Sequence, residues 1–394
     1  MPVAAQKMSS GSQSALREAN AARILDAVQR FGSLTQVELV EATNLSAATV
    51  STIVKQLLAA GSIEVRTTTR SGRRAQLVTL AHAEGLLVGV HIGVRSARIV
   101  VSDTTFSTLS DNSLPLRADH QHDTTLDRVA LLIVEQVEML GSSISEVLGI
   151  GIGLPAPVDP ATGHIAARGL LRGWEDVDVA DRLSKRLNTP VYIDKDANFG
   201  AIAEARFGAG RGVSDFLYVR ASFTTSMGLM VHGEIFHGPH GTAGEIGHIQ
   251  VDPLGQICRC GSRGCLDTVV GAQALIDALS ASMGPVSLSD MLRLAGEGDP
   301  GSRQVLADAG AIIGNHVANL AVAMDPSLVI VGGELADPQG IFIEPLRAAF
   351  ARRVLLNHDG PFQVVTAELG DGAAVHGALA IAADHAHESA GGRA

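Results

Sequence analysis

The sequence contains only three cysteines and no run of eighteen apolar residues. A membrane-spanning helix needs about 20 such residues, so we expect no membrane partner. The first twenty residues are polar and lack the apolar segment of a secretory signal peptide. A disulfide framework is not expected either, because the cysteines are so few. The sequence therefore predicts a protein of the reducing cytoplasm.

The chain has 394 residues, 46% of them hydrophobic, which is enough for two or three domains with sizeable cores. Its net charge is −11, but the charge is distributed unevenly. Residues 1–80 carry nine Lys or Arg and five acidic residues, a net charge of +4 that leaves −15 for the remainder. A basic head joined to an acidic body indicates a DNA-binding module linked to a sensor.

Residues 14–82 have the pattern of a helix-turn-helix followed by a wing. Apolar residues recur at helical spacing between residues 14 and 31. Thr35, with Glu38 three residues later, predicts a second helix that begins with a capping box. Ser46 predicts the cap of a third helix, which Gly61 ends. This order of helices is typical of DNA-binding domains.

The segment after the third helix favours a DNA-binding domain over an ordinary helical hairpin. Residues 62–67 and 76–80 alternate like strands, and a basic tip joins them into a wing. The alternative is that the hydroxyls of the third helix only cap it and that the arginines are solvated. We expect operator DNA to be contacted in the major groove by Thr49, Ser51, Thr52 and Lys55, and by the wing-tip residues Arg70, Arg73 and Arg74.

All three cysteines lie within eight positions, at Cys258, Cys260 and Cys265, and His248 lies ten residues before the first. Three thiolates and an imidazole form a complete tetrahedral set for a structural Zn²⁺, with no position left for water or substrate. The alternative is three unrelated buried thiols. Glu245 lies three residues before His248, so the metal would hold this carboxylate in a fixed place, oriented towards a ligand.

The segment GEIGH followed by CRCGSRGCLD resembles the signature of the ROK family, which comprises repressors, uncharacterised reading frames and sugar kinases. Flanking matches extend the resemblance from about residue 85 to about residue 382. The basic head resembles the N-terminal domain of ROK repressors, which ROK sugar kinases lack. The resemblance also implies a homodimer or homotetramer.

The resemblance implies an α/β fold in which two actin-like, ribonuclease-H-like lobes follow the winged helix-turn-helix. The ligand-binding domain would span residues 85–385. We expect its smaller lobe at about 85–198 plus a C-terminal helix at 373–385, and its larger lobe at about 199–372. Residues 1–13 and 386–394 are predicted to be disordered.

By the same resemblance, the cleft between the lobes binds a sugar or sugar phosphate. Asp196 stands at the position of the general base of phosphoryl transfer, although an Asp in front of a helix is often only a cap. Asp267 replaces the family's Glu, and both Lys195 and Leu170 replace Asn residues that contact the sugar. The expected ligand-binding residues are Lys195, Asp196, Glu245, His248 and Asp267.

The two phosphate-binding motifs of the family are altered in this chain. His91 stands where ROK kinases have an Asp, and Val94 replaces a Gly. In the second motif, Phe223 and Met227 are bulky where glycines are needed for backbone to approach a phosphate. We therefore predict that ATP use is lost and that the chain is not an enzyme, with Asp196 a residual base position.

The favoured function is a ROK-type transcriptional regulator, a repressor, that binds operator DNA and senses a sugar derivative in a zinc-stabilised cleft. Two alternatives remain open at this stage. One is an active ATP-dependent sugar kinase with an added DNA-binding head. The other is a DNA-binding regulator that responds to no ligand.

Overall fold

The computed structural model describes residues 17, 19–25, 27–28, 34–59, 62–70, 73–80, 85–336, 339–354 and 362–391, with backbone alone at 66–70, 73–75, 80 and 388–391. The chain forms two compact units, Met1–Glu84 and Gly85–Ala394, and each is described by itself. The expected disordered segment at residues 1–13 lies outside the described residues.

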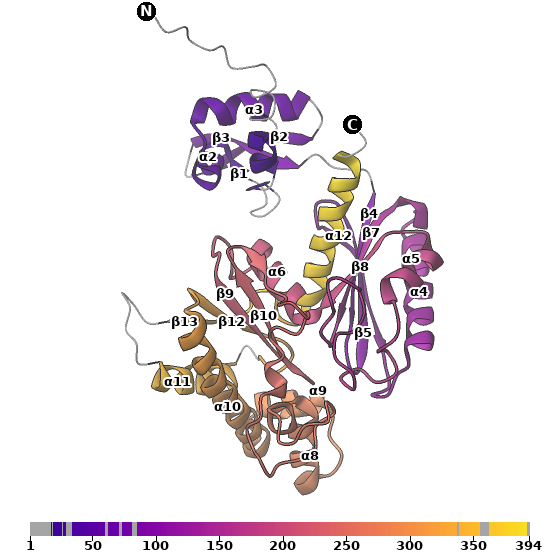
Figure 1. Ribbon diagram of the computed structural model, residues 1–394, viewed down its shortest axis with the longest axis vertical. Helices are drawn as coiled ribbons and strands as arrows, with labels where there is room; N and C mark the ends of the chain where they lie inside the picture. Colours follow the sequence, from indigo (N-terminus) through magenta and orange to yellow (C-terminus); the bar gives the residue numbers. More distant parts are fainter. Residues whose placement is uncertain are drawn as a thin grey trace, which may run out of the picture. The chain divides into compact units, whose positions relative to one another are not determined.

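The first unit is a winged helix-turn-helix (Figure 1). Its helices surround a small core that includes Ile24, Leu39, Val50 and Ile63. Its three-stranded sheet has the order β1-β3-β2, and β2 and β3 form an antiparallel hairpin. The elements are β1 (Leu34–Thr35), α2 (Gln36–Thr43), α3 (Ala47–Ala59), β2 (Ile63–Arg70) and β3 (Arg73–Leu80), after helical residues between 17 and 28.

Local hydrogen bonds at the helix starts are those that the sequence predicts. Thr35 Oγ1 accepts from the Glu38 backbone N–H at 3.3 Å, and Glu38 Oε2 accepts from the Thr35 N–H at 2.7 Å. Ser46 Oγ accepts from the Thr49 N–H at 3.1 Å and so caps α3. The wing strands are longer than predicted, because the threonines at 68 and 69 extend β2 instead of forming a loop.

The second unit contains two five-stranded sheets with the same topology. In each sheet the first three strands form an antiparallel meander. The fourth strand pairs in parallel with the first, and the fifth pairs in parallel with the fourth. This repeat confirms the actin-like fold. The first lobe has the order β6-β5-β4-β7-β8, from β4 (Leu86–Ile92), β5 (Ser96–Asp103), β6 (Thr108–Pro115), β7 (Val147–Leu154) and β8 (Val191–Lys195). The second has the order β11-β10-β9-β12-β13, from β9 (Phe216–Ala221), β10 (Thr225–Val231), β11 (Glu234–Ile235), β12 (Leu328–Gly332) and β13 (Gln363–Thr366).

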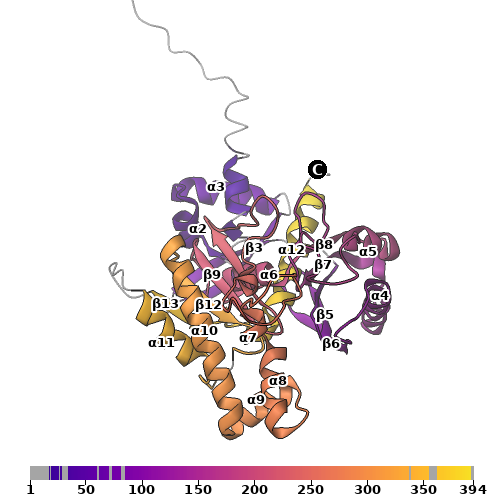
Figure 2. The ribbon, with the colours of Figure 1, turned by 60° about the horizontal axis from the view of Figure 1, so that its bottom comes forward.

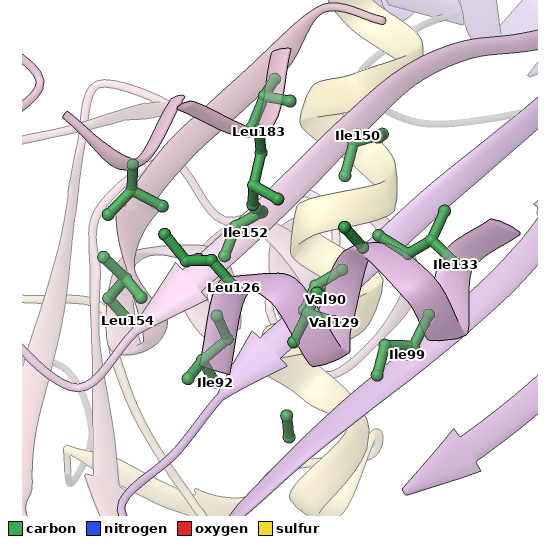
Figure 3. Packing of buried hydrophobic residues seen from close by; sticks show 14 of the residues in the cluster. Val90, Ile92, Ile99, Leu126, Val129, Ile133, Ile150, Ile152, Leu154 and Leu183 are labelled. Atoms are coloured by element: carbon green, nitrogen blue, oxygen red, sulfur yellow. The ribbon is translucent and has the colours of Figure 1, made fainter. Parts of the chain in front are cut away.

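In the first lobe, helices cover both faces of the sheet. The helices α4 (His122–Met139) and α5 (Val179–Leu187) pack on one face. Figure 3 shows this core, where Leu126, Val129 and Ile133 of α4 lie against Val90, Ile99 and Ile152 of the strands. The other face is covered by α12 (Ala373–Gly391), which also packs against α6 (Asp196–Phe207) in both ribbon views (Figures 1 and 2).

In the second lobe, α6 lies on one face of the sheet, and the remaining helices lie on the other. Those helices are α7 (Asp267–Val270), α8 (Ala272–Met283), α9 (Leu288–Glu297), α10 (Pro300–Met324) and α11 (Ile343–Arg353). By length and composition α10 is apolar enough to cross a membrane. Here its apolar stripe, which includes Leu306, Ile313 and Val317, is buried in the core of the lobe.

The glycines of β4 and β7 allow α12 to lie directly on the first sheet. A Cβ atom at Gly89 would collide with the carbonyl oxygen of Val375, and a Cβ atom at Gly151 would collide with that of Ala378. These glycines therefore serve helix packing. The helix continues to Gly391, past the predicted end at residue 385, so the predicted tail at 386–394 is wrong up to that point. Residues 392–394 lie outside the described residues.

Candidate ligand pocket and metal centre

The junction between β8 and α6 brings three consecutive charged residues into the second unit's interior. Asp194 accepts hydrogen bonds from the Lys195 backbone N–H at 2.6 Å and from Asn198 Nδ2 at 2.8 Å. It also lies 2.8 Å from Nε2 of His237, and this hydrogen bond raises the pKa of the His237 imidazole. Asp194 thus fixes the junction, and sequence reasoning missed both Asp194 and His237.

Asp196 is buried and belongs to an ion-pair network, but it does not cap α6. Its Oδ2 lies 3.4 Å from His91 Nε2 and 3.5 Å from Arg220 Nη1. Burial raises the pKa of Asp196, but the charge of Arg220 and the hydrogen bond from His91 outweigh burial and leave the pKa below its ordinary value. An aspartate held as an anion by a buried cation is a poor proton acceptor.

Arg220 is the central cation of this network, and sequence reasoning missed it. Its Nη2 donates to Glu334 Oε2 at 3.1 Å, while Nη1 faces Asp196. Both carboxylates raise the pKa of the Arg220 guanidinium, against the effect of burial. The sequence does contain a sign of this role. Arg220 lies in the otherwise apolar segment FLYVRA, and a charged residue in a buried strand needs a partner of opposite charge.

A narrow pocket lies beside this junction. It is lined by four of the five expected ligand-binding residues, namely Lys195, Glu245, His248 and Asp267. The fifth, Asp196, is absent from the lining. The remaining wall residues are Pro155, Leu170, Thr224, Thr225, Ser226 and Arg259.

The polar groups of this pocket are only partly paired. Lys195 Nζ donates to the carbonyl oxygen of Ala243 at 2.5 Å and lies 3.1 Å from Glu245 Oε1, an ion pair without hydrogen-bond alignment. Burial raises the pKa of Glu245, and Lys195 counteracts this increase. In the pocket wall, Ser226 Oγ is buried without a hydrogen-bond partner among the described residues, and Glu245 Oε1 is engaged only by the ion pair with Lys195. Such atoms in a pocket are available to a ligand or to water.

Asp267, which replaces the family's Glu, is held by backbone. Its Oδ1 accepts a hydrogen bond from the Thr225 N–H at 2.7 Å. Burial raises the pKa of the Asp267 carboxyl, and the Thr225 hydrogen bond lowers it. The shorter side chain therefore sits at the pocket wall, bound to the strand that carries the altered phosphate motif.

A second narrow pocket adjoins the first and shares Pro155 and Thr224 with it. Its other wall residues come from the two altered phosphate motifs and the ion-pair network: Gly93, Val94, Arg95, Ser96, Arg220, Ser222, Phe223 and Glu334. The guanidinium of Arg95 lies 5.8 Å from the centre of the Phe223 ring, and its Nη2 donates to Gln273 Oε1 at 2.9 Å. Side chains thus link the two lobes across this pocket.

The predicted metal ligands His248, Cys258, Cys260 and Cys265 converge, with their ligand atoms within 4.8 Å of one another. Cys258 Sγ lies 3.5 Å from His248 Nδ1, and the Sγ atoms of Cys260 and Cys265 are 3.7 Å apart. A tetrahedral Zn²⁺ with bonds of about 2.3 Å to sulfur and about 2.0 Å to nitrogen requires ligand separations of about 3.5 to 3.8 Å. The four residues therefore fit a metal ion, and three thiols clustered in this way are not independent core residues.

Burial shapes the chemistry of this cluster. It raises the pKa of Cys265 to about 12, and it also raises the pKa of Cys258. Buried thiolates are thus unfavourable unless a cation is bound among them. A metal ion would supply that charge and displace the thiol protons.

The predicted DNA-contact residues of α3 lie off its buried face, which Val50, Ile53, Val54 and Leu57 form. Thr52 and Lys55 are exposed, and Ser51 is half-buried. Thr52 Oγ1 donates to the Ala48 carbonyl oxygen at 2.8 Å, and Thr49 Oγ1 shares a hydrogen bond of 2.8 Å with Ser46 Oγ. Arg70 pairs with Arg73 at the end of the hairpin, but the side chains of Arg70, Arg73 and Arg74 lie outside the described residues.

Known proteins resemble this chain over nearly its whole length. The xylose repressor of Bacillus subtilis is 25% identical over 375 residues, which cover 95% of this chain and 97% of the repressor. The DNA-binding transcriptional dual regulator NagC of Escherichia coli is 26% identical over 386 residues, 94% of each chain.

Two solved structures share the fold. A ROK family transcriptional regulator, a homologue of the Escherichia coli MLC protein, matches 95% of this chain and 97% of its own, with a TM-score of 0.74 and 22% identity. A ROK family glucokinase from Streptomyces griseus, solved with glucose and AMPPNP, matches 77% of this chain and all of its own, with a TM-score of 0.68 and 28% identity.

Family profiles divide the chain where its two units divide. The MarR family profile matches residues 18–74, within the winged helix-turn-helix. The ROK family profile matches residues 87–385, which hold both lobes, the pocket and the cysteine cluster. The match covers well over half of the chain, and we conclude that the chain belongs to the ROK family.

Proposed function

We propose that this chain is a transcriptional repressor of the ROK type, which binds operator DNA through its first unit and a sugar-type effector through its second. The observation that carries the proposal is the joining of a MarR-type winged helix to a complete ROK domain. The xylose repressor and NagC match nearly the whole chain. The glucokinase matches only about as much of the chain as the ROK domain occupies.

The chemistry of the pocket beside Lys195 and Glu245 supports a polyhydroxylated effector. Glu245 and Asp267 offer carboxylate oxygens to sugar hydroxyls, and Ser226 Oγ can donate or accept. Leu170 provides an apolar patch for the C–H face of a sugar ring. Buried oxygens without partners cost free energy until a ligand or water satisfies them, and a sugar hydroxyl would do so.

The adjoining pocket supports the proposal that kinase activity is lost. The Arg220 cation lies beside Asp196, where phosphoryl transfer needs a base. Phe223 and Arg95 occupy the mouth of the region where the family resemblance places nucleotide phosphates. His91 supplies an imidazole where the family has a carboxylate that could hold Mg²⁺.

The cysteine cluster would hold a structural Zn²⁺, since three sulfurs and one nitrogen leave no open coordination position. The ion would supply positive charge that keeps the thiolates deprotonated. Glu245 lies three residues before His248, and Asp267 lies two residues after Cys265. Fixing the cluster would therefore fix both pocket carboxylates.

Repression and sensing are coupled in this proposal because DNA and effector bind different conformers of a cytoplasmic homodimer or homotetramer. Effector binding between the lobes would change the spacing of the paired DNA-binding units. Each ligand then weakens the binding of the other by the same factor.

The decisive test is fluorescence anisotropy of purified protein with DNA from its own upstream region. We expect salt-sensitive, sequence-selective binding that Lys55→Ala weakens. Lys185→Ala, an exposed lysine of the ROK domain, is the matched control and should leave binding unchanged. DNA binding without sequence preference would contradict the repressor proposal. DNA binding together with no calorimetric heat from any sugar or sugar phosphate would favour a regulator without a ligand.

A sugar kinase remains the second candidate, because Asp196 is retained at the strand-to-helix junction. This candidate requires ATP hydrolysis that depends on a hexose and is abolished by Asp196→Asn. We expect no such activity in the wild-type protein, and its detection would replace our proposal.

A further inference from the structure

We infer that Arg259 gives the effector pocket an anion-binding position, and that the effector is a sugar derivative bearing a carboxylate or phosphoryl group. The inference rests on the proposed sensor function and narrows the class of ligand. Arg259 lies between two of the clustered cysteines, and its side chain lines the same pocket as Glu245 and Asp267.

The first support is the state of the charged groups in the pocket wall. Lys195 is already paired with Glu245 and with the carbonyl oxygen of Ala243. Asp267 is hydrogen-bonded to the backbone of Thr225. The Arg259 guanidinium, in contrast, makes no hydrogen bond or ion pair with any residue in the described part of the chain. Its charge acts on the Asp267 carboxyl without a direct bond, so its N–H donors remain open to a ligand.

The second support is that the Arg259 backbone is held in place on both sides. The loop closes through hydrogen bonds from Cys258 N to Ser262 O at 2.8 Å and from Gly261 N to Cys258 O at 3.0 Å. Across the cleft, the Arg259 carbonyl oxygen lies so close to Gly169 that a Cβ atom there would collide with it. The next residue, Leu170, lines the pocket, so Arg259 is fixed where the two lobes meet.

These positions divide the pocket by chemistry. Sugar hydroxyls would bond to Ser226 Oγ, which is buried without a hydrogen-bond partner, and to the Glu245 carboxylate, which is also paired with Lys195. The guanidinium of Arg259 presents a planar fork of donors that matches a carboxylate or phosphoryl group in a bidentate manner. A neutral sugar would fill the first region and leave Arg259 without a partner.

A structural explanation of Arg259 competes with this one. Three thiolates, one imidazole and a divalent cation carry a net negative charge, which a neighbouring guanidinium would offset. That role predicts that loss of Arg259 lowers metal content and weakens every ligand equally. An effector-binding role predicts a selective loss for anionic ligands at constant metal content.

The experiment is isothermal titration calorimetry on the full-length, metal-loaded protein with matched ligands. Glucose, xylose and N-acetylglucosamine are each compared with their terminal phosphates, and glucose also with glucuronate and gluconate. We expect at least one anionic member to bind roughly tenfold or more tightly than its neutral parent, an advantage that shrinks as salt is raised. The phosphate and carboxylate arms distinguish the two kinds of anion.

The variant Arg259→Gln should remove that advantage and leave the neutral parent within about twofold of wild type. Arg263→Gln is the matched control, since Arg263 belongs to the same loop but donates to Gly255 O and is absent from the pocket wall. Metal analysis of both variants must match that of wild type.

Equal or tighter binding of the neutral parents would overturn the inference and leave the sensor function standing. An equal loss for all ligands, or metal loss in Arg259→Gln alone, would assign Arg259 to the metal loop and also overturn it. The absence of binding by every compound would overturn the sensor function itself.

Discussion

The cleft of the second unit has two adjoining halves that share Pro155 and Thr224 but differ in how their polar groups are satisfied. In the half beside Arg220, the guanidinium pairs with the carboxylates of Asp196 and Glu334, and Arg95 lies against Phe223. In the half beside the cysteine cluster, Ser226 Oγ is buried without a hydrogen-bond partner, and Arg259 acts on the Asp267 carboxyl only through its charge. Polar groups without a hydrogen-bond partner are more available to a ligand than groups that are already paired.

The largest expected effect concerns the half beside Arg220. Arg220→Met leaves the buried Asp196 and the half-buried Glu334 without their cation, and we expect a loss of about 3–5 kcal/mol in the free energy of unfolding. Chemical denaturation measures this loss. Glu334→Gln in the same chain should restore part of it, because one uncompensated charge disappears. If Arg220→Met is as stable as wild type, this half does not depend on the network.

The next effect concerns the half that holds the metal ligands. Cys260→Ser leaves one nitrogen and two sulfurs, and we expect lower metal content and a loss of about 2–3 kcal/mol in stability. Effector binding should fall with it, because Glu245 and Asp267 flank the cluster. Metal analysis measures the metal content, and calorimetry measures effector binding. Arg220→Met serves as the control and should keep its metal. Full metal content in Cys260→Ser would refute the four-ligand site.

A smaller effect should separate binding from stability. Ser226→Ala removes a buried hydroxyl without a partner, so the free protein should be as stable as wild type or slightly more so. Effector affinity should nevertheless fall by about 0.5–1.5 kcal/mol. Ser102→Ala is the matched control, since Ser102 Oγ is also buried without a partner but belongs to β5. Equal affinities in both variants would show that Ser226 does not bind the effector.

The smallest effect concerns pH. The hydrogen bond to Asp194 raises the pKa of His237 in the folded state, so the imidazolium stabilises the fold below the unfolded pKa of about 6.5. That contribution is lost as pH rises through the folded pKa. Near pH 6, we expect the free energy of unfolding of wild type to exceed that of His237→Gln by less than about 1 kcal/mol. At alkaline pH, the two values should be equal. A difference that grows with pH would contradict this assignment.

Much of the fold could be predicted because it rests on local patterns. The capping box at Thr35, the Ser46 cap and the cysteine spacing each depend on residues within a few positions of one another, and the structure confirms them. The repeat of two lobes came from resemblance rather than from pattern. The sequence predicts the wing strands and the last helix too short. Their β-branched and alanine-rich segments continue the strand or helix beyond the residues in which the hydrophobic periodicity is clear.

The candidate site could be predicted only in part, because its network joins residues that are distant in sequence. Asp196, Arg220 and Glu334 come from three separate elements, and spacing alone cannot pair them. Asp194 was passed over in favour of its neighbour, although it holds His237 and Asn198. Arg259 was not predicted as a pocket residue, because it lies between two cysteines and the segment was interpreted only as a metal site.

The position of α12 has a consequence for how the protein is made. Its residues from Ala373 onward are synthesised after every strand of the ROK domain, yet they cover a face of the sheet whose strands are among the first of that domain to emerge. Leu87 and Val100 therefore stay uncovered on that face until α12 has been made. We expect the nascent chain to expose this apolar surface in the meantime, and a truncation within α12 to expose it permanently.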